Sequence, residues 1–133
     1  ISAPNFMNDY KKNMEHLDLD ASFLSRSLND GFSGGEKKRN EMLQMLMLKP
    51  KLCILDETDS GLDVDALAII SKSIQAMRNN NRSFIIITHY HRILEHLDAD
   101  HVHILSKGAI VKTGGKNLAI EIEQKGFKTV LSK

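Results

Sequence analysis

Two adjacent carboxylates follow a short apolar run near the middle of the chain. Residues 52–55 read Leu-Cys-Ile-Leu and lead directly into Asp56 and Glu57. Open α/β sheets bind their ligands at the carboxyl ends of the strands. At such a position Asp56 could orient Mg²⁺ through water, and Glu57 could polarise a water for in-line attack on a phosphate. By itself the pattern is weak, because a strand that ends in solvated acids is more common.

A second group with phosphate-binding character lies 23 positions before Asp56 and reads Ser33, Gly34, Gly35, Glu36. Two glycines at a helix start leave backbone N–H groups open to an anion, and the helix dipole favours negative charge there. The hydroxyl of Ser33 adds a further donor. A flexible turn with a helix cap explains the same four residues better when they are considered alone.

Helical patterns surround this second group. Apolar residues at helical spacing predict a helix from Asn5 to Leu17, and Phe23 and Leu24 predict a short turn or helix. The helix that starts at Ser33 runs to Leu48 and is apolar nearly all round, so we expect it to be buried and to be ended by Pro50. Its methionines, Met42, Met45 and Met47, are expected in the core.

Strand and helix patterns alternate through the rest of the chain. The predicted strands are residues 52–55, 83–88 and 102–105, and the helices between them are residues 64–77 and 90–97. Such alternation predicts an α/β fold with a parallel sheet at its core. After Lys107 and Gly108 we expect an antiparallel strand at residues 109–112, and then a last helix at residues 117–125.

Length and composition limit the class of protein. A chain of 133 residues with 41% hydrophobic residues suits one globular domain or a piece of a larger one. The formal charge of +1 gives no electrostatic reason to expect nucleic acid or a membrane surface. The single cysteine, Cys53, lies in an apolar run and suits a reduced, cytoplasmic compartment. Because Ile1 stands where an initiator Met would, we expect a segment of a longer protein.

Four motifs in order identify a family. The run from Phe32 to Glu36 resembles the signature of ABC-type ATPases, and residues 52–57 resemble their Walker B strand. Residues 60–63 are similar to the D-loop, and His89 stands where the family has its switch histidine. The resemblance implies the C-terminal portion of an ABC ATPase domain, with residues 1–32 in the helical subdomain and residues 33–133 in the ATPase core.

The residues in three stretches of the sequence narrow the resemblance to one branch of the family. Residues 31–39, 56–63 and 88–94 closely resemble the SufC branch, the ATPase subunits of SUF iron–sulfur cluster assembly. That resemblance implies SufB- and SufD-like partners, with ATP and Mg²⁺ bound by the complete subunit. Two alternatives stay open, namely the ATPase subunit of an ABC importer and a non-catalytic half that lends its signature to another subunit.

The resemblance also implies roles for individual residues in a transient head-to-tail dimer of ATPase subunits. Residues of the signature would contact the γ-phosphate bound to the facing subunit, and the D-loop would contact that subunit. These residues are Ser33, Gly34, Gly35, Glu36 and Asp63. On the subunit's own nucleotide, Asp56 would hold Mg²⁺, Glu57 would orient water, and His89 would contact the γ-phosphate. Lys38 is implied as a regulatory, resting-state partner of Glu57.

The loop that grips ATP phosphates is not found in this sequence. No Gly-x-x-x-x-Gly-Lys followed by Ser or Thr occurs. The run Gly114-Gly115-Lys116 fails, since Ile110 stands where the first glycine is needed and Asn117 where a hydroxyl is needed. The chain by itself is therefore predicted neither to bind nor to hydrolyse ATP. Without the strands that carry that loop, we expect an exposed sheet edge and exposed apolar faces.

Two other sequence patterns could suggest a metal-binding site. Histidine pairs at 89 and 91 and at 101 and 103 have the spacing of metal ligands, although ordinary surface and strand histidines explain them better. The acids between residues 56 and 65 fail as a calcium loop, because Leu67 would occupy the position of the bidentate acid. Cys53 is expected to be a small buried hydrophobe, since no second cysteine is present.

Overall fold

The computed structural model describes residues 2–27, 30–89 and 92–131. The chain divides into two compact units, residues 1–89 and residues 90–133. The predicted boundary between residues 32 and 33 lies inside the first unit and stays a prediction. Among the described residues, no helix combines the length and the apolar character needed to cross a membrane.

The first unit begins with helix α1, Ala3–His16, as predicted. Ser2 caps it by accepting a hydrogen bond from the Asn5 N–H at 3.4 Å, so the helix begins two residues before the predicted start. Its apolar residues separate by position: Met14 and Leu17 are buried, whereas Phe6 is exposed. The predicted short helix is η1, Ala21–Leu24.

Helix α2, Gly34–Leu48, packs against α1 and against α3. It ends at Lys49, whose left-handed backbone (φ 48°) precedes Pro50. Of its apolar residues, Met42, Leu43 and Met45 are buried, but Leu48 is 77% exposed. The prediction of a helix buried all round is therefore wrong at its C-terminal end, because burial depends on which neighbours cover each face.

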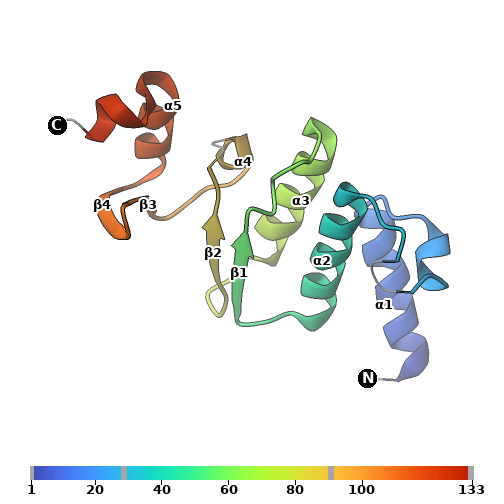
Figure 1. Ribbon diagram of the computed structural model, residues 1–133. Coiled ribbons are helices and arrows are strands. Elements are labelled where there is room, and N and C mark those ends of the chain that lie inside the picture. Colours follow the sequence, from blue (N-terminus) through green and yellow to red (C-terminus); the bar gives the residue numbers. More distant parts are fainter. Residues whose placement is uncertain (1, 28–29, 90–91, 132–133) are drawn as a thin grey trace. The chain divides into compact units, whose positions relative to one another are not determined.

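A parallel pair of strands forms the sheet of the first unit. Strand β1, Leu52–Asp56, pairs with β2, Ser83–Ile87, in the register Ile54↔Ile85. Helix α3, Val64–Met77, connects them, which confirms the predicted β-α-β order (Figure 1). The Arg82 guanidinium donates to the carbonyls of Pro50 at 2.7 Å and Met77 at 2.6 Å, so it joins the start of both strands to the end of α3.

One face of this sheet is apolar and exposed. Cys53 and Leu55 are buried, while the alternate residues of β1 and β2 point the other way. Those exposed residues are Leu52, Ile54, Ile85 and Ile87. The expectation of exposed apolar faces agrees with the structure. Cys53 is confirmed as a buried free thiol, and burial raises its pKa.

The second unit contains helix α4, Arg92–Glu95, then a hairpin of β3, Val102–Ser106, and β4, Ala109–Gly114. The hairpin is antiparallel, as predicted. In the part that the structure describes, β3 pairs with β4 in a sheet of its own, so its expected place in the parallel sheet is not observed. The predicted helix 90–97 begins at Tyr90 and His91, which lie outside the described residues.

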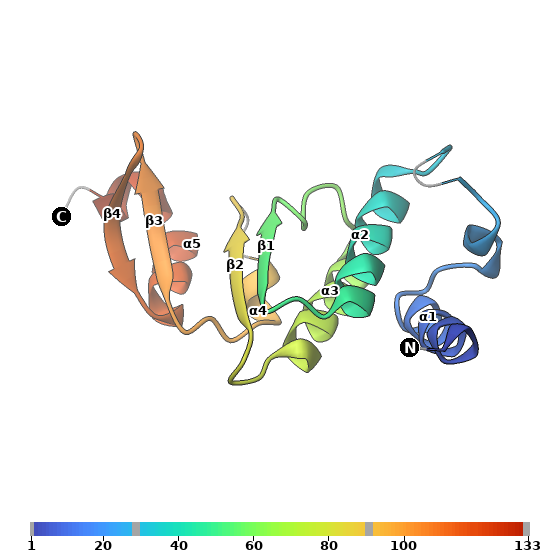
Figure 2. The same cartoon turned by 90° about the horizontal axis from the view of Figure 1, so that it is seen from below.

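The last helix, α5, is Lys116–Leu131 and extends beyond the predicted residues 117–125. Gly126, with φ 72° and ψ 158°, interrupts its helical geometry. A small core joins α5 to the hairpin and consists of Ile104, Leu118 and Val130, with Val102 and Ile122 packed against it. Figure 2 shows α5 against the two strands of the hairpin.

Candidate functional site

The carboxyl ends of β1 and β2 bring Glu57 and His89 together. The Glu57 N–H donates to the Ile87 carbonyl at 2.8 Å, which continues the strand pairing by one residue. The His89 Nδ1 lies 3.3 Å from Glu57 Oε1. Both side chains are more than half exposed, at 52% for His89 and 57% for Glu57. The structure therefore places a carboxylate and an imidazole side by side where solvent and ligand can reach them.

Glu57 adopts a left-handed backbone with φ 46°. Residues other than glycine rarely occupy this region, and where they do the surrounding structure has to hold them there. Here the hydrogen bond to Ile87 does so. Such backbone strain is concentrated at functional sites, which supports a chemical role for Glu57.

A partly buried hydrogen bond joins the loop after β1 to the end of β2. Thr88 Oγ1 donates to Asp59 Oδ2 at 2.5 Å, and Asp59 is 7% exposed. The second oxygen of this carboxyl, Oδ1, is buried and has no partner among the described residues. Since Thr88 precedes His89, the bond positions the histidine relative to the loop. Sequence reasoning missed this pair, because no motif links residues 29 positions apart.

An open pocket lies beside these residues and is lined by Lys38, Asp56, Glu57 and Ser60. Its volume is about 370 Å³, and it is broadly open to solvent. The exposed Asp56 carboxylate and the Ser60 hydroxyl offer oxygen ligands, which suits Mg²⁺ held partly through water. In the described ranges, no three His, Cys, Asp or Glu residues form a group that could hold a metal alone.

Lys38 occupies the same pocket as Glu57, but its recorded ion pair is with Glu41 at 3.7 Å. The recorded partner of Glu57 is His89. The predicted pairing of Lys38 with Glu57 is therefore not formed in this structure, although the pocket brings both residues to one place. A regulatory role for Lys38 stays a prediction.

The start of α2 carries the predicted anion-binding turn. Ser33 and Glu36 form a capping box: Ser33 Oγ accepts from the Glu36 N–H at 3.2 Å, and Glu36 Oε2 accepts from the Ser33 N–H at 2.6 Å. Apart from the adjoining residues and the helix's own backbone, no atom lies within 4 Å of a Cβ built on Gly34 or Gly35, so no other described part of the chain crowds these two positions.

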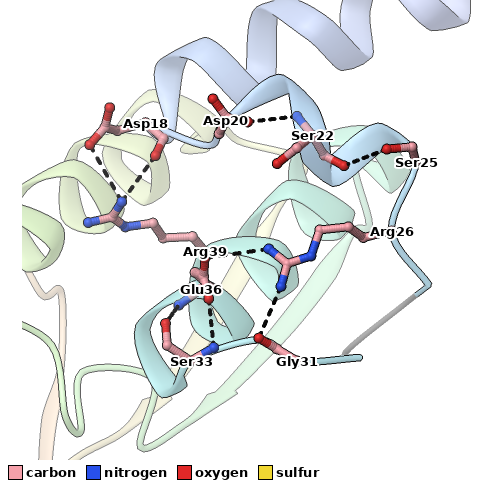
Figure 3. A network of polar contacts seen from close by, with 9 residues as sticks. All are labelled: Asp18, Asp20, Ser22, Ser25, Arg26, Gly31, Ser33, Glu36 and Arg39. Carbon is pink, nitrogen blue, oxygen red and sulfur yellow. Dashed lines mark hydrogen bonds and ion pairs between the residues drawn. The ribbon is translucent and has the colours of Figure 1, made fainter.

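Two arginines that sequence reasoning did not single out hold this turn (Figure 3). Arg26 forms an ion pair with Glu36, with Nη1 3.8 Å from Oε1, and Arg39 Nη1 donates to the Asp18 carbonyl at 3.1 Å. The hydrogen bonds from Ser33 lower the pKa of Glu36 below its ordinary value, and the charges of Arg26 and Arg39 lower it further. Glu36 is thus held as a carboxylate.

Asp63 caps α3 and accepts a hydrogen bond from the Ala66 N–H at 2.7 Å. This local role explains why the helix begins at Val64. The contact predicted for Asp63 across a dimer stays a prediction.

The run that failed as a phosphate loop has a structural role. A Cβ on Gly114 would lie 3.1 Å from the Cβ of Leu118, and Lys116 forms an ion pair with Asp98 at 3.0 Å. The rings of His101 and His103 are stacked with centroids 6.3 Å apart, and His103 Nδ1 is 2.9 Å from Thr113 Oγ1. The turn and the second histidine pair are accounted for by packing and strand contacts.

Comparison with known sequences identifies relatives over nearly the whole chain. The family described as ABC transporter matches residues 5–60. The chain is 50% identical over 127 residues to Vegetative protein 296 of Bacillus subtilis (strain 168), covering 96% of this chain and 49% of that protein. It is 48% identical over 123 residues to the probable ATP-dependent transporter SufC of Escherichia coli (strain K12), covering 92% and 50%.

A third relative, the probable ATP-dependent transporter ycf16 of Trieres chinensis, is 51% identical over 128 residues, covering 96% of this chain and 51% of that protein. The chain spans about half the length of the curated relatives it matches. These relatives confirm the resemblance that the motifs predicted.

Solved structures agree on the fold. An ATP-binding cassette of an ABC transporter superimposes with a TM-score of 0.70 at 22% identity, over 96% of this chain and 49% of that one. A bacterial Atm1-family ABC exporter with ATP bound gives a TM-score of 0.71 at 20% identity, over 95% and 23%. The predicted fold class, an α/β arrangement that forms part of an ABC ATPase domain, is confirmed.

Proposed function

We propose that this chain, which belongs to the ABC-type ATPase sequences of the SufC and ycf16 group, is part of an ATP-hydrolysing subunit. The observation that carries the proposal is the pairing of Glu57 with His89 at 3.3 Å, at the carboxyl end of a parallel strand pair. An exposed carboxylate can orient an attacking water, and a neighbouring imidazole can contact the phosphate that the water attacks. By "complete subunit" we mean this chain joined to the region that its relatives, about twice as long, also contain.

The side chains around the pocket have different roles toward the nucleotide that the same subunit binds. Glu57 orients the attacking water, and His89 contacts the γ-phosphate from the neighbouring strand. Asp56 holds Mg²⁺ through water, and the ion supplies charge neutralisation on the phosphates. The Thr88–Asp59 bond keeps His89 at a fixed distance from Glu57.

The turn at the start of α2 serves a second nucleotide, bound to the facing subunit of a head-to-tail dimer. The N–H groups of Gly34 and Gly35 and the hydroxyl of Ser33 recognise the γ-phosphate, with Glu36 beside them. Asp63 contributes a contact from the D-loop. In this arrangement one chain takes part in two sites, so dimer formation and hydrolysis are coupled.

The biological setting that we propose is iron–sulfur cluster assembly in the cytoplasm, with SufB- and SufD-like partners. Its support is the 48% identity to a protein named SufC over 92% of this chain. The word transporter in the names of the same relatives favours a second candidate, the ATPase subunit of a membrane transporter. Affinity purification of the complete subunit separates the two, since the first predicts SufB- and SufD-like proteins and the second a membrane permease.

The test of the ATPase proposal is Glu57→Gln in the complete subunit. The substitution keeps the shape of the side chain and removes its ability to accept a proton. ATP binding should stay within about twofold of wild type, and turnover should fall by about 10²–10⁴, the range for loss of a general base. Binding of a fluorescent ATP analogue and phosphate release measure the two quantities.

The matched control is Glu15→Gln on the exposed surface of α1, which removes the same charge far along the chain from the pocket. It should leave turnover unchanged. Wild-type turnover by Glu57→Gln, or no turnover by a folded wild-type subunit with its partners, would overturn the proposal.

A further inference from the structure

We propose that Arg26 is a positioning residue of the anion-binding turn: it compensates the charge of Glu36 and thereby allows a turn that contains a carboxylate to accept a phosphate. This inference rests on the proposed function and adds a residue to the site that serves the facing nucleotide. The turn brings the Glu36 carboxylate into conflict with the phosphate that it is proposed to bind.

The conflict is electrostatic. Glu36 bonds to the Ser33 N–H at 2.6 Å, so its carboxylate is held at the turn whose N–H groups are open. A phosphate bound at those N–H groups would repel the Glu36 carboxylate, and in the closed space between two subunits little water would screen that repulsion. A glutamate here therefore needs a fixed positive charge that stays with it.

Arg26 supplies that charge and is itself held in place. Its Nη1 lies 3.8 Å from Glu36 Oε1, and its Nη2 donates to the Gly31 carbonyl at 3.0 Å. The guanidinium carbon lies 5.0 Å from the ring centroid of Phe23 and 4.9 Å from that of Phe32. A planar guanidinium can stack on rings and donate at its edge at the same time, which a lysine ammonium cannot.

The two rings beneath Arg26 are buried and close together. Phe23 and Phe32 are each 9% exposed, and their ring centroids are 4.7 Å apart. Phe23 belongs to η1 and Phe32 directly precedes Ser33, so the arginine connects η1 to the turn.

The other positively charged side chains near the turn make different contacts. Arg39 bonds to the carbonyl of Asp18 at 3.1 Å and to its carboxylate at 3.5 Å, which ties α2 to the turn after α1. Lys37 is exposed on α2. Of the ion pairs recorded in the described residues, the one with Glu36 is made by Arg26.

The test separates charge from packing. Arg26→Met keeps a long apolar side chain over the two rings and removes the charge. Glu36→Gln keeps the capping box, which accepts either residue, and removes the opposing charge. If Arg26 acts by compensation, its charge becomes dispensable once Glu36 is neutral.

In the complete subunit, Arg26→Met should lower kcat/KM for ATP by about fivefold to thirtyfold, which corresponds to the loss of one partly exposed charge contact at an interface. The double variant Arg26→Met/Glu36→Gln should return to within about twofold of Glu36→Gln alone. Lys37→Met is the matched control, because it removes an exposed positive charge from α2, directly after Glu36 in the sequence. Its kcat/KM should stay near that of wild type, with or without Glu36→Gln.

A second measurement does not depend on ATP. An NMR titration of the complete subunit should show a higher pKa for Glu36 in Arg26→Met than in Lys37→Met, although the Ser33 hydrogen bonds, which lower this pKa most, still hold it below its ordinary value. If the pKa does not move, or if the double variant is as impaired as Arg26→Met, charge compensation is wrong. If Arg26→Met retains wild-type kcat/KM, Arg26 has no positioning role.

These outcomes are distinct from failure of the proposed function. An inactive wild-type subunit would overturn the ATPase proposal and this inference together. An active wild type whose Arg26→Met variant is not rescued by Glu36→Gln would overturn this inference alone. Should Arg26→Met lose its fold, Arg26→Lys keeps a charge without the stacking and should be impaired less than Arg26→Ala.

Discussion

The turn at the start of α2 and the loop after β1 are both expected to meet a phosphate, but different parts of the chain hold them. In the turn, Ser33 and Glu36 bond to each other across three positions. In the loop, Asp59 depends on Thr88, which is 29 positions away on the next strand. The turn can therefore form with its own helix, whereas the loop forms only when β1 and β2 pair.

The two regions also differ in how completely their polar groups are satisfied. Glu36 has a hydrogen bond and an ion pair. Asp59 Oδ1 is buried without a partner in the described structure, and Glu57 has a left-handed backbone. The loop stores strain that the turn does not, which is typical of a region whose geometry is set by chemistry. Three substitutions test this contrast.

The largest effect should come from Thr88→Val. Valine keeps the shape of threonine but leaves the buried carboxyl of Asp59 without its donor, at a cost of about 2–3 kcal/mol in the free energy of unfolding. Urea unfolding of the chain measures it. Thr88→Ser is the control, because it keeps the hydroxyl. Equal costs for the two variants would mean that the hydrogen bond does not hold the loop.

A smaller effect is expected from Ser33→Ala in the turn. Removal of the cap acceptor should cost about 1 kcal/mol, the usual value for an N-cap. Ser33→Thr retains the cap and should cost less in the same urea experiment. A loss as large as that of Thr88→Val would contradict the view that the turn is the locally stabilised region.

The smallest change in stability is expected from Lys38→Ala, at the place where the two regions meet. Lys38 belongs to α2 but lines the pocket with Glu57, and its ion pair with Glu41 is a surface pair worth less than about 1 kcal/mol. If Lys38 restrains Glu57 in the resting subunit, the substitution should raise partner-free ATP turnover by up to about fivefold. Lys72→Ala on α3 is the control, and unchanged turnover in Lys38→Ala would end the regulatory proposal.

Helices and strands were predicted well where caps, turns and regular apolar spacing mark them clearly in the sequence. Helix α3 begins and ends where predicted, since Asp63 is a strong cap and the apolar spacing is regular. The hairpin of β3 and β4 follows from Lys107 and Gly108, which adopt the positive φ that the turn needs. Asp56, Glu57 and His89 were predicted at strand ends, and the pairing of β1 with β2 brings Glu57 and His89 together.

Burial was predicted less well, because apolar character does not say what covers a side chain. Leu48 and Ile54 are as apolar as Leu43 and Leu55, yet the first two are exposed and the second two are buried. Arg26 illustrates the same limit for polar groups. Nothing in its neighbours along the sequence indicates that it stacks on two rings and pairs with Glu36.

The sequence by itself determined the order of the helices and strands, the capped start of α2 and the motifs that name the family, since these depend on residues only a few positions apart. Tertiary structure alone decided that Thr88 holds Asp59, that Lys38 shares a pocket with Glu57, and that Arg26 lies against Glu36. Those contacts join residues that are separated along the chain, and strand pairing and side-chain packing bring them within reach of one another.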